Sequence, residues 1–167
     1  MNERTKKIVT AALIAALTCV ATMIIKIPSP LKGYLNLGDC MVLVAGWFLS
    51  PAYGFLAAGF GSALADIFSG YMIYAPATFA IKGIMALVAY FGGKLFRKNF
   101  GNLTSRIISG AVAELLMILG YFMFEGVMYG FILSAVNIPA NGVQGVVGLI
   151  LGIVLMGIIE KCKLSQG

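Results

Sequence analysis

Long apolar stretches, separated by short breaks that carry proline, glycine or charge, run through the whole chain. Hydrophobic residues make up 60% of the sequence and charged residues 11%, and the mean hydropathy is +0.98. Soluble domains average roughly 45 to 50% apolar residues, so this chain is too apolar for water. A membrane-spanning helix needs about 20 apolar residues, and the chain has room for about six such helices and little else. The sequence therefore predicts an all-α integral membrane protein of one domain.

The breaks divide the chain into six expected transmembrane helices. Prolines mark several helix ends, because proline lacks the N–H that a helix interior needs. The break from Lys26 to Tyr34 holds two prolines and a glycine and is expected to form a structured loop. A signal peptide also begins with basic residues, but five more apolar stretches follow, so we expect the first to be retained. The expected spans are 8–25, 35–49, 52–68, 76–96, 107–131 and 139–159.

Basic residues predict the orientation of this six-helix bundle. Loops on the cytoplasmic side of membrane proteins carry an excess of Lys and Arg. With both termini cytoplasmic, the outer loops hold only Lys26 and Lys32. Nine basic residues then lie inside: Arg4, Lys6, Lys7, Lys94, Arg97, Lys98, Arg106, Lys161 and Lys163. The Pro-rich loop, the loop from Tyr71 to Tyr74 and the turn at Asn137 are consequently expected on the outer side. This distribution also accounts for the net charge of +6 without nucleic-acid binding.

Ionisable side chains within the apolar stretches predict a binding site. Asp39, Asp66, Lys82, Glu114 and Glu125 each cost roughly 2.5 to 3.5 kcal/mol in hydrocarbon, so they are expected to face the bundle interior. Helical spacing places Glu114, Tyr121 and Glu125 on one face of the fifth span, and further polar pairs share faces of other spans. Most of these groups fall in the outer half of the bundle. The expected cavity is lined by Asn36, Asp39, Asp66, Tyr74, Lys82, Tyr121, Glu125, Asn141 and Gln144.

Packing roles are open for several of these residues. Lys82 could form a buried ion pair with Asp66 or Glu125 that fixes helix packing. Asp39 could accept backbone N–H groups at the start of its helix instead of contacting a ligand. Glu114 lies deeper in its span and could belong either to the cavity or to helix packing.

The sequence lacks the residues that enzymes, metalloproteins and nucleotide-binding proteins usually need. The chain contains no histidine, the commonest general base and metal ligand. The nearest fragment to a nucleotide-binding P-loop, Gly93-Lys94, has Val88 and Leu95 where the motif needs glycine and a hydroxyl. The three cysteines have no paired spacing. We therefore expect no metal, no cofactor and no enzymatic activity.

Small residues predict close helix contacts. Ala11 and Ala15, with Ala12 and Ala16, form a flat alanine strip on the first span, which suits either an internal contact or a partner protein. Gly148 and Gly152 have the same spacing on the sixth span, and there internal packing is the expected role.

Several strings of residues resemble one transporter family over essentially the whole chain. They are residues 33–39 (GYLNLGD), residues 61–66 (GSALAD), residues 74–78 (YAPAT), Lys82-Gly83 and the alanine strip. Together they resemble the substrate-binding S components of energy-coupling factor (ECF) vitamin transporters. The resemblance implies a subunit of the bacterial cytoplasmic membrane that binds a vitamin from outside. It also implies that the alanine strip meets a transmembrane coupling subunit, which acts with two ATPases, and that the Lys26 to Tyr34 loop is a lid.

The substrate is less closely defined by these residues. They are most similar to the pyridoxine or hydroxymethylpyrimidine branch of the family, with riboflavin-type S components as near relatives. A small hydroxylated heteroaromatic suits tyrosines for stacking and carboxylates or amides for hydrogen bonds, and a flavin suits them too. An alternative of another class is a self-sufficient proton-coupled transporter that uses Asp66, Glu114 and Glu125 as relays, although the two halves show no internal repeat.

Overall fold

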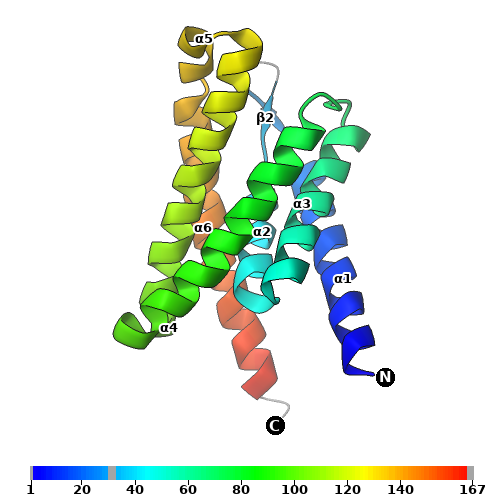
Figure 1. The fold of residues 1–167 in the computed structure, drawn as a ribbon, viewed down its shortest axis with the longest axis vertical. Coiled ribbons are helices and arrows are strands. Elements are labelled where there is room, and N and C mark those ends of the chain that lie inside the picture. Colours follow the sequence, from blue (N-terminus) through cyan, green and yellow to red (C-terminus); the bar gives the residue numbers. More distant parts are fainter. Residues whose placement is uncertain (1, 30–32, 165–167) are drawn as a thin grey trace.

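The chain folds into a bundle of helices with one short β-ladder at one end (Figure 1). The computed structural model describes residues 2–29 and 33–164. The predicted outer-loop residue Lys32 lies outside the described residues. The elements are α1 (Glu3–Ile24), β1 (Ile27–Pro28), β2 (Tyr34–Leu35), α2 (Gly38–Phe48), α3 (Pro51–Phe68), α4 (Ala75–Tyr129), α5 (Phe131–Ala135) and α6 (Ile138–Leu164).

Helix α4 contains two of the predicted spans. It runs down the bundle, reverses at Gly101 and returns as a second arm (Figure 1). Gly101 has φ 75° and ψ 179°, a backbone conformation that glycine adopts without the steric cost of a Cβ. The predicted spans 76–96 and 107–131 correspond to these two arms, residues 75–100 and 102–129. The predicted polar connection between them, residues 97–106, is helical except at this glycine.

Helix α2 is shorter than the predicted second span, 35–49. It starts only at Gly38, because Leu35 pairs with Ile27 and Tyr34 with Pro28 in the antiparallel ladder of β1 and β2. Its 11 residues rise about 16 Å, roughly half of the hydrocarbon thickness. Within the described residues, the helical segments long and apolar enough to cross a membrane are Glu3–Ile24, Ala75–Tyr129 and Phe131–Cys162. Residues 35–37 and Leu49 of the predicted span 35–49 therefore lie outside α2.

The short α2 nevertheless lies at the centre of the bundle. It packs against α1, α3, α4 and α6. Val42, Leu43 and Ala45 are completely buried there, and Met85 and Ala86 of α4 lie in the same core cluster. Large apolar side chains cover the outside of the surrounding helices, among them Leu13, Leu115 and Ile150, as expected of a surface in contact with lipid.

The two ends of the bundle differ in what they carry. The β-ladder, the turn between α3 and α4, and α5 lie at one end, and both termini and the Gly101 bend lie at the other (Figure 1). The Pro-rich loop, the loop from Tyr71 to Tyr74 and the turn at Asn137, which the sequence predicts on one side, belong to this first end in their described residues. The turn predicted near Asn137 is preceded by the five-residue helix α5, which the sequence pattern does not reveal. The spans 8–25, 52–68 and 139–159 overlap α1, α3 and α6.

Close packing of α1 on α3 requires glycine at position 61. A Cβ there would lie 2.5 Å from the carbonyl oxygen of Ala15 and 2.8 Å from Thr18 Cβ. Overpacking of this kind costs about 1 to 3 kcal/mol. Gly61→Ala should therefore lower the thermal unfolding temperature of the purified protein in detergent. Gly157→Ala is the matched control, because no atom lies within 4 Å of a Cβ there; equal unfolding temperatures for the two variants would contradict the close approach.

Candidate ligand-binding site

A polar cavity opens at the end of the bundle that carries the β-ladder. Its volume, with the open mouth included, is about 410 Å³. The centre of a water-sized sphere can move through only about 30 Å³ of this space. The side chains around it are therefore close together. We call it the polar cavity; its lining consists of Ser29, Gly33, Tyr34, Asn36, Asp66, Tyr71, Tyr74, Thr78, Tyr121, Glu125, Asn137, Asn141 and Gln144.

The described part of the loop between α1 and α2 contributes Ser29, Gly33, Tyr34 and Asn36 to this lining, and we call residues 26–29 and 33–35 the lid segment. The Tyr34 hydroxyl donates a 2.7 Å hydrogen bond to Asp66 Oδ1 on α3. The Tyr34 ring lies 4.7 Å from that of Tyr71, and Lys26 Nζ donates to Ser69 Oγ at 3.0 Å. Burial raises the pKa of the Tyr34 hydroxyl well above its usual range, and the Asp66 carboxyl raises it further, so Tyr34 is a neutral donor.

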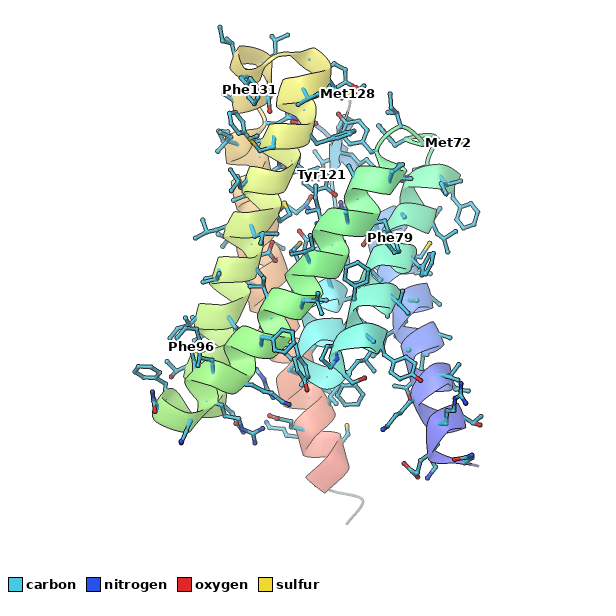
Figure 2. The ribbon with its side chains drawn as sticks, viewed as in Figure 1. Met72, Phe79, Phe96, Tyr121, Met128 and Phe131 are labelled. Carbon is cyan, nitrogen blue, oxygen red and sulfur yellow. The ribbon has the colours of Figure 1, made fainter. Side chains whose placement is uncertain are left out.

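Glu125 lines the cavity from the second arm of α4. Asn137 Nδ2 donates to both carboxylate oxygens, at 2.9 and 3.0 Å, and the Tyr74 hydroxyl donates to Oε1 at 3.4 Å. Thr78 and Tyr121 join the two arms of α4 through a 3.1 Å hydroxyl–hydroxyl hydrogen bond. Figure 2 shows Tyr121 between these arms, toward the end that carries the cavity.

A buried ion pair lies behind the cavity. Lys82 of α4 pairs with Asp39 Oδ1 of α2, and both side chains are almost fully buried. Gln144 Nε2 of α6 donates to Asp39 Oδ2 at 2.7 Å, and Gln144 Oε1 accepts from the Asn36 backbone N–H at 2.9 Å. Lys82 Nζ is also 5.4 Å from the centre of the Tyr121 ring. The ion pair thus holds cavity-lining groups from three segments in place.

The structure brings together seven of the predicted site residues: Asn36, Asp66, Tyr74, Tyr121, Glu125, Asn141 and Gln144 line the polar cavity. Asp39 and Lys82 are not in its lining. The ion pair considered for Lys82 with Asp66 or Glu125 is instead made with Asp39. Nor does Asp39 serve as the helix-start acceptor, because Asn36 Oδ1 accepts from the Gly38 N–H at 2.8 Å.

Several lining residues are absent from the predicted set: Ser29, Gly33, Tyr34, Tyr71, Thr78 and Asn137. Most lie in or next to loops, where helical periodicity gives no information about direction. Tyrosines at the predicted outer ends of spans are the one signal that could have included Tyr34 and Tyr71, because their hydroxyls need polar partners.

Some buried polar atoms have no hydrogen-bond partner among the described residues. They are Asp66 Oδ2, Ser62 Oγ and both carboxylate oxygens of Glu114. Asp66 lines the cavity, whereas Glu114 does not. A Cβ at Gly148 would lie 2.7 Å from Asp39 Cβ and 3.1 Å from Glu114 Oε1, so α6 passes close to both side chains. Gly148 thus has the internal packing role expected from its spacing.

The alanine strip divides between the two sides of α1. Ala11 belongs to the buried core, and the Ala15 carbonyl closely approaches Gly61 of α3. Ala12 and Ala16 are exposed. Only the second pair is therefore available to a partner in this structure, and Ala11 is an internal packing residue.

Comparison with known proteins agrees with these observations. The family described as "ECF-type riboflavin transporter, S component" matches residues 2–161. An uncharacterised protein of Pyrococcus woesei is 37% identical over 144 residues, 85% of this chain and 93% of that protein. The thiamine precursor transporter HmpT of Lactococcus lactis is 26% identical over 168 residues, 99% of this chain and 95% of that protein.

Two solved structures resemble the fold. The S component of a bacterial ECF transporter matches with a TM-score of 0.76 and 25% identity, over 95% of this chain and 98% of that one. The S component for biotin from an ECF-type ABC transporter matches with a TM-score of 0.58 and 17% identity, over 94% and 95% of the chains, which supports the fold alone.

The fold and the cavity define a membrane protein with a polar cavity at one end of a helical bundle. The family match over nearly the whole chain makes the assignment specific: the protein belongs to the S components of ECF transporters. It is accordingly a multi-pass protein of the cell membrane and a transport subunit without enzymatic activity. The family predicted from the sequence is confirmed.

The Lys82–Asp39 pair should determine stability. Lys82→Met leaves the Asp39 carboxylate buried without its cation, which costs about 3 to 5 kcal/mol. We expect a strongly lowered unfolding temperature and poor yield for Lys82→Met, and partial recovery in the double variant Lys82→Met/Asp39→Asn. Thermal unfolding of the three proteins in detergent measures this; a double variant as unstable as the single one would show that the two side chains do not act as a pair.

Proposed function

We propose that this S component captures a small hydroxylated heteroaromatic vitamin or precursor from outside, hydroxymethylpyrimidine first and pyridoxine second. The near full-length similarity to a thiamine precursor transporter supports this substrate class. The subunit would deliver its ligand inward when coupled to a transmembrane coupling subunit and two ATPases. This proposal places six helical segments in the membrane with both termini cytoplasmic, so that the polar cavity faces outward.

The observation that carries the proposal is the unpaired Asp66 Oδ2 in the cavity lining. A buried carboxylate oxygen without a hydrogen-bond partner destabilises the protein. An amino or hydroxyl group of a ligand would donate the missing hydrogen bond. Glu125, Asn141 and Gln144 supply further acceptors and donors, and the tyrosines supply aromatic faces. A pyrimidine with amino and hydroxymethyl substituents presents the required donors on one small ring.

The charge of the lining favours an unphosphorylated ligand. No lysine or arginine appears among the lining residues that the structure describes, and the nearby Lys82 is already paired with Asp39. A phosphate would therefore meet the carboxyl groups of Asp66 and Glu125 without a compensating cation.

Riboflavin is the alternative substrate, because the matching family is described by it. The small free space in the polar cavity supports a compact ring over a tricyclic flavin with a sugar-like chain. A flavin would need a larger displacement of the lid segment and of Tyr34.

A binding experiment separates these ligands. Titration calorimetry of the purified chain in detergent should give tight 1:1 binding of hydroxymethylpyrimidine, weaker binding of pyridoxine and no binding of either phosphate ester. Mass spectrometry of small molecules that co-purify with the chain provides an independent readout. Tight riboflavin binding with no response to hydroxymethylpyrimidine would overturn the substrate assignment but retain the S-component family.

Asp66 and Glu125 should contribute directly to affinity. Hydrogen bonds to charged groups contribute about 1.5 to 3 kcal/mol, so Asp66→Asn and Glu125→Gln should each raise Kd about tenfold or more. Glu160→Gln is the control, because Glu160 pairs with Arg106 at the other end of the bundle. Unchanged Kd in folded Asp66→Asn and Glu125→Gln proteins would exclude the polar cavity as the binding site.

Ala12 and Ala16 should affect transport without affecting binding. Replacing both with leucine adds bulk to an exposed face of α1, where a coupling subunit would need close approach. We expect loss of vitamin uptake in cells that supply the ATPase module, and a Kd of the isolated chain within a few-fold of the parent. Ala80→Leu, the same change at an exposed alanine of α4, is the control. Normal uptake by the Ala12→Leu/Ala16→Leu protein would exclude this face as the coupling surface.

A further inference from the structure

A second cavity lies at the opposite end of the bundle, beside the bend of α4. Its volume, with the open mouth included, is about 480 Å³. The centre of a water-sized sphere can move through about 130 Å³ of this space. It therefore has more free space than the polar cavity. We call it the basic cavity; its lining consists of Trp47, Tyr90, Gly93, Lys94, Arg97, Asn102, Ser105 and Arg106.

The cations of this cavity are only partly neutralised. Arg106 is paired with Glu160 of α6 through two hydrogen bonds, at 3.0 and 2.5 Å. No carboxylate of the described residues lies within ion-pair distance of Lys94 or Arg97. The lining therefore presents excess positive charge to whatever enters, together with guanidinium groups whose planar N–H donors match the oxygens of a phosphate.

The walls of the cavity are held in place by the fold. Trp47 Nε1 donates to Ser109 Oγ at 3.1 Å, and Ser105 Oγ donates to the Asn102 carbonyl at 2.8 Å. Lys94 Nζ lies 4.6 Å from the centre of the Tyr90 ring. The two arms of α4 and the end of α2 thus form a fixed concave surface in which a small anion would be surrounded by donors.

Apolar side chains flank the same bend. Leu95 and Phe100 of the first arm and Leu103 of the second arm are more than half exposed. Phe96 lies on the first arm (Figure 2). An anionic group bound in the cavity would therefore lie next to a surface suited to hydrocarbon chains. A phospholipid has this combination of a phosphate and acyl chains, whereas a soluble phosphate uses only the cavity.

We propose that the basic cavity binds the phosphate of an anionic phospholipid head group, with the acyl chains lying against the apolar side chains around the α4 bend. The predicted orientation puts this end at the cytoplasmic surface, where anionic lipids attract clusters of Lys and Arg. The site is separate from the polar cavity. It favours an anionic ligand, whereas the polar cavity disfavours one.

Native mass spectrometry of the delipidated chain in detergent tests the site. Phosphatidylglycerol should be retained as one preferred adduct, and phosphatidylcholine should be retained at least tenfold less. Lys94→Gln/Arg97→Gln should lose this preference. Lys98→Gln/Lys161→Gln removes the same charge from exposed positions outside the cavity lining and should keep it. Asn102→Asp, a single change that adds a negative charge at the cavity, should also reduce retention about tenfold.

Each contrary result has a definite meaning. Equal retention by the Lys94→Gln/Arg97→Gln protein and the control double variant would overturn the site, as would equal retention of the two lipids. Inorganic phosphate is the remaining test ligand. If it raises the unfolding temperature as much as phosphatidylglycerol does and displaces the lipid, the ligand is a soluble phosphate. The lipid assignment is then wrong. Vitamin binding by Lys94→Gln/Arg97→Gln should match the parent, which makes this outcome independent of the proposed substrate.

Discussion

The buried pair of Lys82 and Asp39 joins the short central helix to the long one beside it. In a low-dielectric interior neither charge is tolerable alone, so α2 and α4 can pack here only with both side chains aligned. The remaining oxygen of Asp39 then fixes Gln144 on α6, and Gln144 fixes the chain at Asn36. Helix packing and the geometry of the polar cavity therefore depend on the same interaction.

The shortness of α2 explains why a cavity exists at that end at all. A full-length helix would fill the space above Gly38 with its own backbone. Instead, Tyr34 and Leu35 are extended and pair with residues 27–28, and the Tyr34 hydroxyl reaches Asp66. Because the Tyr34 hydroxyl is a neutral donor, this contact adds no charge to the cavity.

Much of this arrangement could be predicted from the sequence. Hydropathy located the apolar helices, and the cost of buried charge selected the residues that gather at one end. The length of α2 could not be predicted, because the sequence of residues 35–37 is compatible with a helix, whereas Leu35 lies in β2 and residues 36–37 connect β2 to α2. The partner of Lys82 was also missed: Asp39, Asp66 and Glu125 all lie near the same end, and helical periodicity cannot rank distances between helices. Loop residues such as Tyr71 and Asn137 were missed because loops carry no periodic pattern.

The position of Lys82 also bears on which ligands the polar cavity can accept. If this cation faced the cavity, it would attract phosphate esters and other anions. Because Asp39 neutralises it behind the lining, the described lining presents two carboxyl groups, several amides and neutral tyrosine hydroxyls. Such a lining favours hydrogen-bond donors and penalises anionic groups, since neither carboxyl group has a free cation beside it. The interaction that holds the helices together thus also neutralises the α4 cation nearest to the described lining of the cavity.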